Sequence, residues 1–146
     1  MNVTYKEVKT IKDSIDAIRI RVDVFIVEQK CPPGWEPDEL DKKSTHFVAI
    51  INKEIVATVR LRKESKNILK IERMAVKKEF RKKGIGLGLT KYVLSQALKK
   101  KYKKIWIQAQ LHAQKMYEKV GFKVTSEPYD LYNLNILHID MEYIFS

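Results

Sequence analysis

The sequence predicts an α/β fold, with a mixed sheet of about six to seven strands and helices packed on it. Two observations support this fold class. In several short segments apolar residues alternate with polar ones, which is typical of strands, and in others they recur every three or four positions, which is typical of helices. No internal repeat or linker divides the chain, so we expect residues 1–146 to form a single domain.

The N-terminal half is predicted to contain one helix and four strands. Residues 3–8 have the pattern of a short strand, and the apolar spacing between residues 11 and 27 predicts a helix. Residues 30–43 contain three prolines and a glycine, which indicates a loop. Loops of this length are often functional. Three strands follow, at Thr45–Ile51, 54–61 and 67–76.

The C-terminal half is predicted to contain two helices and three further strands. The helices are expected at residues 85–98 and 113–120. The strands are expected at residues 105–109, 122–125 and 136–144. In the last segment Leu137, Ile139, Met141 and Tyr143 fall on one face of the strand, and His138, Asp140 and Glu142 fall on the other.

Charge and composition exclude several classes of protein. The net charge is +11, and lysines gather between residues 99 and 104. A nucleic-acid surface is one interpretation, but a solvated helix end is favoured because cations stabilise that end of a helix. The chain has one cysteine, Cys31, no secretory signal and no apolar run of membrane length. We therefore expect a cytoplasmic protein with no membrane or nucleic-acid partner and, from its histidine spacing, no metal site.

The chemistry is concentrated in residues 72–90. A strand ends, a basic turn follows, and Gly84, Gly86 and Gly88 open a helix. Glycines allow a ligand to approach the backbone, and the N-terminal end of a helix offers unpaired N–H groups and positive partial charge. The segment is therefore suited to a pyrophosphate. It matches neither the P-loop nor the dinucleotide-binding glycine pattern.

This segment resembles the acetyl-CoA motif of the GNAT N-acetyltransferase superfamily, because Arg81-x-x-Gly84-x-Gly86 follows a strand that ends in Met-Ala-Val. Residues 109–122 resemble the family's second signature, which contains Tyr-Glu-Lys-x-Gly-Phe. Residues 24–32, Glu-Pro-Tyr at 127–129 and residues 136–139 resemble the ElaA-like branch. The resemblance covers nearly the whole chain.

The resemblance implies a GNAT fold in which the parallel strands 4 and 5, here 67–76 and 105–109, splay apart to hold acetyl-CoA. Tyr117 matches the tyrosine that protonates the leaving thiolate. Gln110 stands where many relatives have an Asn that contacts the pantetheine arm. The residues implied to bind the cofactor are Met74, Ala75, Val76, Arg81, Lys82, Lys83, Gly84, Ile85, Gly86 and Gln110.

The general base is left open among three residues. Glu72 is the first candidate, because two-residue alternation would place it on one strand face with Met74 and Val76, and an ion pair with a nearby arginine is the alternative. Glu28, which leads into the 30–43 loop, and His138 are the others. A covalent role for Cys31 is disfavoured, because no activating histidine lies near it in the sequence.

The acceptor is expected to be a primary amine of a small molecule. Arg60, Arg62 and Arg73 could hold an anionic group, which favours an amino-sugar phosphate such as glucosamine 6-phosphate, or could pair with Glu72 or Asp140. Lysine peptides and polyamines are the competing acceptors, and the acidic residues of the loop would suit such a cationic acceptor instead: Glu36, Asp38, Glu39 and Asp41. A non-catalytic acetyl-CoA sensor, a nucleic-acid-binding domain and a homodimer are also considered. The residues expected to contact the acceptor are Glu28, Arg60, Arg73 and His138.

Overall fold

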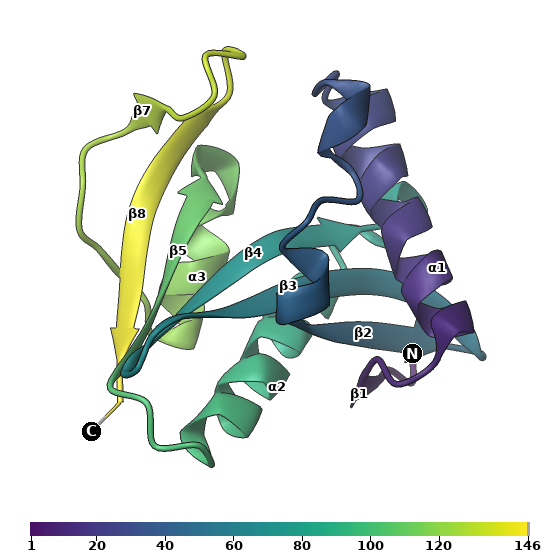
Figure 1. Cartoon of the computed structure of the whole chain (residues 1–146), viewed down its shortest axis with the longest axis horizontal. Coiled ribbons are helices and arrows are strands. Elements are labelled where there is room, and N and C mark those ends of the chain that lie inside the picture. Colours follow the sequence, from purple (N-terminus) through teal and green to yellow (C-terminus); the bar gives the residue numbers. More distant parts are fainter. Residues whose placement is uncertain (146) are drawn as a thin grey trace.

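Eight strands form one mixed sheet in the computed structural model, which describes residues 1–145. Their order is β1-β2-β3-β4-β5-β8-β6, and β7 also pairs with β8. Only β4 and β5 are parallel neighbours. The predicted fold class is therefore confirmed, with one more short strand than expected (Figure 1). The strands are β1 (Thr4–Glu7), β2 (Thr45–Ile51), β3 (Glu54–Ser65), β4 (Ile68–Val76), β5 (Lys104–Gln110), β6 (Lys123–Val124), β7 (Tyr129–Asp130) and β8 (Leu137–Ile144).

The predicted helices are all present. α1 (Ile11–Arg21) is capped by Thr10, whose side chain accepts a hydrogen bond from the Asp13 N–H, and it continues as a π-helical segment, η1 (Val22–Glu28). α2 (Ile85–Leu98) and α3 (Gln114–Val120) complete the set. Short 3₁₀ turns are η2 (Pro33–Trp35), η3 (Asp41–Lys43), η4 (Lys78–Phe80) and η5 (Leu111–Ala113).

Buried apolar residues cover both faces of the sheet. Phe47 and Ala49 of β2 contribute to the core under α2, together with Leu89 of that helix. Val48, which lies between them in the strand, packs on the opposite face against Ile20 of α1. Alternation along the strands therefore places α1 on one face and α2 on the other (Figure 1).

A β-bulge interrupts the pairing of β3 with β4 at Arg73. Thr58 pairs with Ala75 and Arg60 pairs with Glu72, so a step of two residues on β3 opposes three on β4. Arg73 has φ 54°, in the left-handed region that non-glycine residues seldom occupy. A bulge of this kind bends a strand and leaves one residue unpaired.

The bulge reverses which residues of β4 face each side. Before it, Leu69 and Ile71 are buried in the core under α2. After it, Met74 and Val76 pack against that same core. Glu72 therefore points to the α1 face, and the prediction that it shares a face with Met74 and Val76 is wrong. Simple alternation fails because the extra residue shifts the phase by one.

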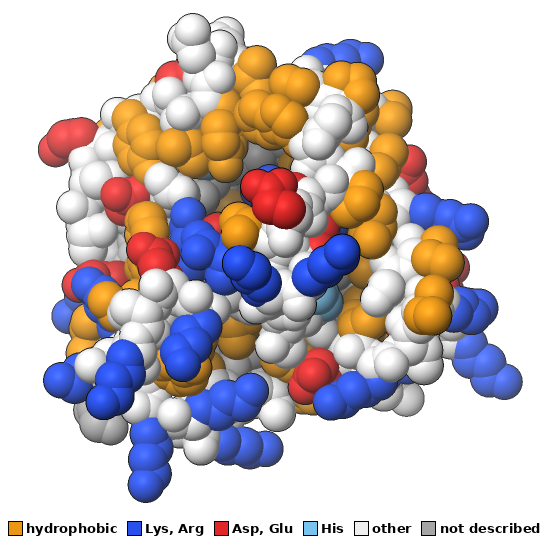
Figure 2. Space-filling model, viewed as in Figure 1, with side chains coloured by type: hydrophobic (Ala, Val, Ile, Leu, Met, Phe, Trp, Pro, Cys, Tyr) orange, Lys and Arg blue, Asp and Glu red, His pale blue; other side chains and the backbone are white. Residues whose placement is uncertain are grey.

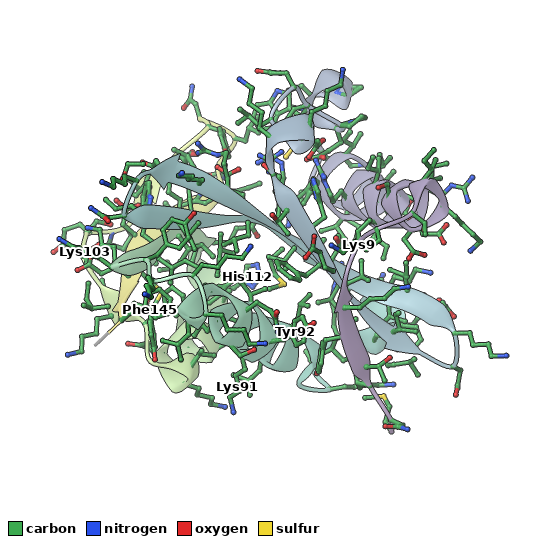
Figure 3. The ribbon with its side chains drawn as sticks, turned by 60° about the horizontal axis from the view of Figure 1, so that its bottom comes forward. Lys9, Lys91, Tyr92, Lys103, His112 and Phe145 are labelled. Carbon is green, nitrogen blue, oxygen red and sulfur yellow. The ribbon has the colours of Figure 1, made fainter. Side chains whose placement is uncertain are left out.

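The glycines around the start of α2 serve different purposes. Gly84 has φ 79° and forms the N-terminal boundary of the helix. Gly88 allows a close approach, because a Cβ there would lie 1.9 Å from the hydroxyl oxygen of Tyr5. The Tyr5 ring stacks on Tyr92 of α2, with the centroids 5.7 Å apart. Figure 3 labels Tyr92. Gly88 therefore joins β1 to α2, rather than serving a ligand.

Candidate active site

A cavity opens where the parallel strands diverge. β4 and β5 pair only as far as Ile71 and Ile107. Beyond them lies a cavity of about 770 Å³, which is lined by α2 and α3 from one side and by η1 and the loop that follows it from the other. In Figure 2 the surface is hollowed near its centre, with charged side chains around the opening. The bend at Arg73 accompanies this divergence, so the bulge helps to shape the site.

Nearly all residues predicted to bind the cofactor line this cavity. Lys83 is the exception, and its ammonium lies 5.7 Å from the centre of the Phe80 ring. No side chain caps the first turn of α2, so its N–H groups are available to an anion. The predicted cofactor residues on the cavity wall are Met74, Ala75, Val76, Arg81, Lys82, Gly84, Ile85, Gly86 and Gln110.

Tyr117 of α3 lines the cavity from the α2 face. Its ring packs edge-on against Phe122, with the centroids 5.6 Å apart. No fully buried side-chain oxygen or nitrogen among residues 1–145 lacks a hydrogen-bond partner. The hydroxyl oxygen has no hydrogen-bond partner there, and Tyr117 lines the cavity. Burial raises the pKa of Tyr117, so the phenol is protonated at neutral pH and can donate that proton.

His138 of β8 lines the same cavity from the other face of the sheet. Its Nδ1 lies 2.9 Å from the carbonyl oxygen of Ile136, and because a carbonyl only accepts, Nδ1 carries the proton. In the neutral ring Nε2 therefore keeps its lone pair. Burial lowers the pKa of His138, so the ring is neutral at pH 7. Nε2 has no hydrogen-bond partner among the described residues, and His138 lines the cavity.

Gln110, at the end of β5, is paired with Gln29. Each side-chain amide donates to the oxygen of the other, at 3.1 and 2.9 Å, and both residues line the cavity. His112 Nε2 lies 2.8 Å from the same Gln110 oxygen. The amide that the sequence suggested for the pantetheine arm is therefore held in place by the residue that follows η1.

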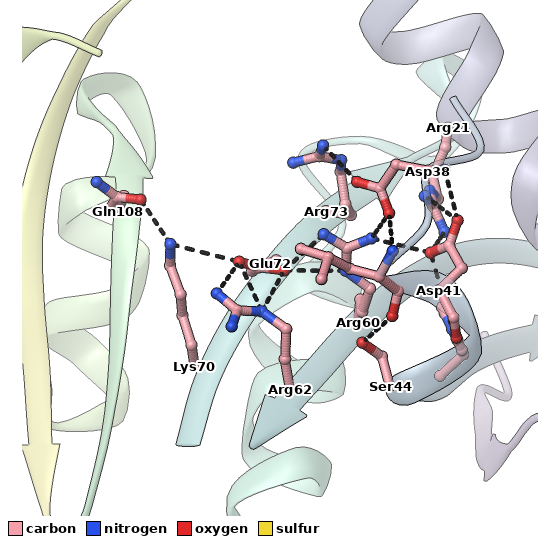
Figure 4. Close-up of polar contacts among 12 residues, drawn as sticks. Arg21, Asp38, Asp41, Ser44, Arg60, Arg62, Lys70, Glu72, Arg73 and Gln108 are labelled. Carbon is pink, nitrogen blue, oxygen red and sulfur yellow. Dashed lines mark hydrogen bonds and ion pairs between the residues drawn. The ribbon is translucent and has the colours of Figure 1, made fainter. Parts of the chain in front are cut away.

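A network of ion pairs, here called the ionic cluster, connects α1 and the loop after η1 to the α1 face of the sheet. Arg21 of α1 is 1% exposed and binds both Glu36 and Asp41. Five carboxylate and guanidinium groups from the loop, from β3 and from β4 extend the cluster across the sheet (Figure 4). Its members are Arg21, Glu36, Asp38, Asp41, Arg60, Arg62, Lys70, Glu72 and Arg73.

Glu72 belongs to the ionic cluster and does not line the cavity. Its carboxylate receives Arg60 at 2.6 Å and Arg62 at 2.9 Å, and Lys70 lies 3.3 Å away. Burial opposes ionisation, but the hydrogen bonds from Arg62 and the charge of Arg60 outweigh it and lower the pKa of Glu72 to about 2. A carboxylate so stabilised in its charged form is a poor base. The general-base prediction for Glu72 is therefore wrong, and the alternative, an ion pair, is present.

The predicted anion site is also not free in this structure. Arg60 is 1% exposed and bonds Asp38, Asp41 and Glu72, so its guanidinium is occupied by carboxylates of the protein itself. Arg73 does line the cavity, but its guanidinium binds Glu36 at 2.6 Å and Asp38 at 3.1 Å. Sequence alone shows the arginines but not the carboxylates that the loop folds onto them.

Glu28, the other predicted carboxylate, bonds the guanidinium of Arg81 through both oxygens at 2.8 Å. These hydrogen bonds lower the pKa of Glu28. The residue is not among those that line the cavity, and its contact with the acceptor stays a prediction. The pair instead joins η1 to the segment before α2, where Arg81 also donates to the Val76 carbonyl oxygen at 3.0 Å.

The ionic cluster predicts a loss of stability in acid. Burial raises the pKa of Asp41, but the hydrogen bonds and the charge of Arg21 outweigh burial and lower this pKa to about 2. The pKa of Glu72 is likewise lowered to about 2 by its own partners. The stabilisation exists above the ordinary carboxyl pKa and is lost as the pH falls toward the lowered one. We expect each group to contribute on the order of 2 kcal/mol, lost between about pH 5 and pH 2.

Urea unfolding measured between pH 7 and pH 3 would check this expectation. The slope of unfolding free energy against pH should be shallower in Asp41→Asn than in the native protein. Glu79→Gln provides a matched control, because Glu79 is exposed on η4 and belongs to no ion pair among the described residues. Equal slopes for all three proteins would contradict the expectation.

The acceptor was expected at the segment 28–46, the adjoining end of the first helix and the last strands, but several side chains of the cavity wall were not named individually. Phe25 and Trp35 come from η1 and η2, and Tyr132 and Ile136 come from the loop between β7 and β8. Cys31 also lines the cavity, and burial raises the pKa of its thiol, which disfavours a thiolate. The loops have no periodicity that would place single side chains, so the sequence indicated the segment after the first helix but not which of its residues face the cavity.

Residues 1–145 contain no group of three or more His, Cys, Asp and Glu side chains arranged to hold a metal ion. No helix in that range has the length and apolar character needed to cross a membrane.

Comparisons with known proteins agree with this geometry. The family model of the acetyltransferase (GNAT) domain matches residues 10–145. An uncharacterized N-acetyltransferase of Bacillus subtilis, YjcF, is 32% identical over 126 residues, which are 86% of this chain and 89% of that protein. The crystal structure of Escherichia coli ElaA superimposes with a TM-score of 0.82 at 25% identity, covering 97% of this chain and 99% of the other.

One further structure shares the fold and contains the expected donor. A GNAT family acetyltransferase from Elizabethkingia anophelis, crystallised with acetyl-CoA bound, superimposes with a TM-score of 0.76 at 22% identity. The two chains overlap over 99% of each.

Proposed function

The chain belongs to the GNAT acetyltransferase family and is an acetyl-CoA-dependent N-acetyltransferase, and on this premise we propose that it acetylates the primary amine of a small molecule by direct attack in a ternary complex. One observation carries the proposal: a single cavity between β4 and β5 is lined by Tyr117 on one face of the sheet and by His138 on the other. A proton donor and a proton acceptor are thus available on opposite sides of the gap.

The residues around the gap have complementary tasks in this proposal. Acetyl-CoA supplies the acetyl group as a thioester. The uncapped start of α2 and the side chain of Lys82 hold the pyrophosphate, and the edge of β4 from Met74 to Val76 binds the pantetheine arm. A backbone N–H near Met74 polarises the thioester carbonyl, as donors aimed at a developing negative charge do. Gln110 contacts the same arm after releasing Gln29.

Proton transfer accompanies the exchange of bonds at the carbonyl carbon. The amine nitrogen forms a C–N bond as the C–S bond breaks. His138 Nε2 accepts the proton released by the amine, and Tyr117 donates its hydroxyl proton to the sulfur, which gives the N-acetyl product and free CoA. The lowered pKa of His138 and the raised pKa of Tyr117 keep each group in the form that it needs at neutral pH.

The identity of the acceptor is a separate question. An amino-sugar phosphate was favoured because Arg60, Arg62 and Arg73 could hold its phosphate, but all three guanidiniums are engaged by carboxylates. Glucosamine 6-phosphate therefore loses that support and serves as a comparison substrate. Lysine peptides and polyamines are the other comparisons. We also infer a single domain, since α1 and α2 cover the two faces of one sheet.

The function is tested with purified protein in two steps. Titration calorimetry should show acetyl-CoA binding, and a panel of amines should then release free CoA thiol in an acceptor-dependent manner. Acetyl-CoA binding without release for any amine would support a sensor and overturn the proposal. Mass spectrometry should find the acetylated amine and, since Cys31 is not a nucleophile in this proposal, no acetylated protein.

A further inference from the structure

We infer that the acceptor is a primary amine with an aromatic or aliphatic body and no anionic group, an inference that rests on the proposed function. It comes from the part of the cavity here called the aromatic end, which is formed by Phe25, Trp35, Tyr132, Ile136 and His138. These residues lie on the side of the sheet opposite Tyr117, where His138 would receive the acceptor's proton.

Aromatic rings connect the two walls of the aromatic end. The Trp35 ring meets Tyr132 at an interplanar angle of 66°, with the centroids 4.7 Å apart. Tyr132 in turn stands at 89° to the His138 ring, with 5.6 Å between the centroids. Trp35 comes from η2 and Tyr132 from the loop before β8, so two segments distant in sequence place aromatic surface beside the proposed base. Such a wall favours an apolar occupant.

Charge at this end is already neutralised. The charged side chains of the wall here are Glu36 and Arg73, which bind each other at 2.6 Å. Glu36 also binds Arg21, and Arg73 also binds Asp38. Among the described residues, the aromatic end thus offers no unpaired cation to a phosphate or carboxylate on the acceptor. A buried anion without a partner is costly, whereas aromatic faces attract an ammonium group.

The surface around this end is apolar as well. Val27, Tyr132 and Leu137 are 57%, 42% and 49% exposed. Tyr132 lines the cavity, whereas Val27 and Leu137 closely follow Phe25 and Ile136, which line it. In Figure 2 hydrophobic side chains gather on both sides above the hollow. Scattered exposed apolar residues are ordinary, but a group of them around one opening marks a binding surface.

A pair of substrates that differ by one carboxylate tests the inference. Phenethylamine and phenylalanine share the aromatic ring and the amine, and only phenylalanine carries the anion. We expect kcat/KM to be at least about 100-fold higher for phenethylamine, because the carboxylate would lack a partner. Glucosamine 6-phosphate, spermidine and a lysine peptide complete the panel.

A matched pair of variants tests whether the aromatic end makes the selection. Tyr132→Ala should raise the KM for phenethylamine by about 10-fold with little change in the affinity for acetyl-CoA, whereas Tyr132→Phe, which keeps the ring, should resemble the native protein. A higher kcat/KM for phenylalanine, the sugar phosphate, spermidine or the peptide would overturn the acceptor class but leave acetyl transfer standing. Failure of every amine to release CoA would overturn the proposed function itself.

Discussion

Replacing Tyr117 by Phe should lower kcat for acetyl transfer by about 10²–10⁴-fold, the range that positioned general acids contribute. The Tyr117 hydroxyl has no hydrogen-bond partner among residues 1–145, so its removal leaves no polar group unpaired there. The ring contact with Phe122 is kept. The fold and the affinity for acetyl-CoA should therefore be nearly unchanged, and steady-state kinetics combined with calorimetry would measure both.

Tyr143→Phe is a suitable control for this variant. Tyr143 contacts the other side of Phe122, with ring centroids 5.7 Å apart, but does not line the cavity. Its loss of a hydroxyl should leave kcat close to the native value. If Tyr117→Phe retained the native rate, Tyr117 would be a packing residue and the thiolate would be protonated by another group.

Replacing His138 by Asn should lower kcat by about 10²–10³-fold if Nε2 receives the proton of the amine. Asn was chosen because its amide N–H can replace Nδ1 as donor to the Ile136 carbonyl, while nothing replaces Nε2. Burial lowers the pKa of His138 below 6.5. The native enzyme should therefore lose rate only when the pH falls through that lowered pKa, which protonates Nε2.

The pH profile distinguishes a base from a structural histidine. In His138→Asn the acidic limb of kcat, measured at saturating amine, should disappear. His46→Asn is the matched control, since His46 bonds the Asp41 carbonyl oxygen and lies outside the cavity wall, and it should keep that limb. An unchanged acidic limb in His138→Asn would remove His138 as the base.

The helices and the strands other than β7 could be predicted along the chain because the longer ones each have an apolar period of their own. The glycines and basic residues before α2 indicated an anion site from local sequence, since a helix start binds anions through local backbone groups, and most of these residues line the cavity. The acceptor side could not be predicted in this way. Glu72 was misplaced by a bulge at Arg73, a position whose side chain gives no sign of a positive φ.

The charged residues show the same limit. Of the two roles left open for the arginines, the structure shows ion pairs, and these include Glu36, Asp38 and Asp41, which lie 19 to 37 residues from their partners in the chain. Such pairs depend on how a loop folds back onto the sheet, and local patterns do not specify this. Tyr132 was missed for the same reason, because it approaches Trp35 only in the folded chain.

The ionic cluster limits how this enzyme can acquire new acceptors through evolution or engineering. The loop after η1 supplies Trp35 to the cavity wall and also supplies the carboxylates that neutralise buried Arg21 and Arg60. A grafted loop without these carboxylates would leave guanidiniums buried without counterions, which is strongly destabilising. The loop is therefore not an interchangeable module. Changes of specificity are better tolerated at single positions such as Tyr132, which lies outside the cluster.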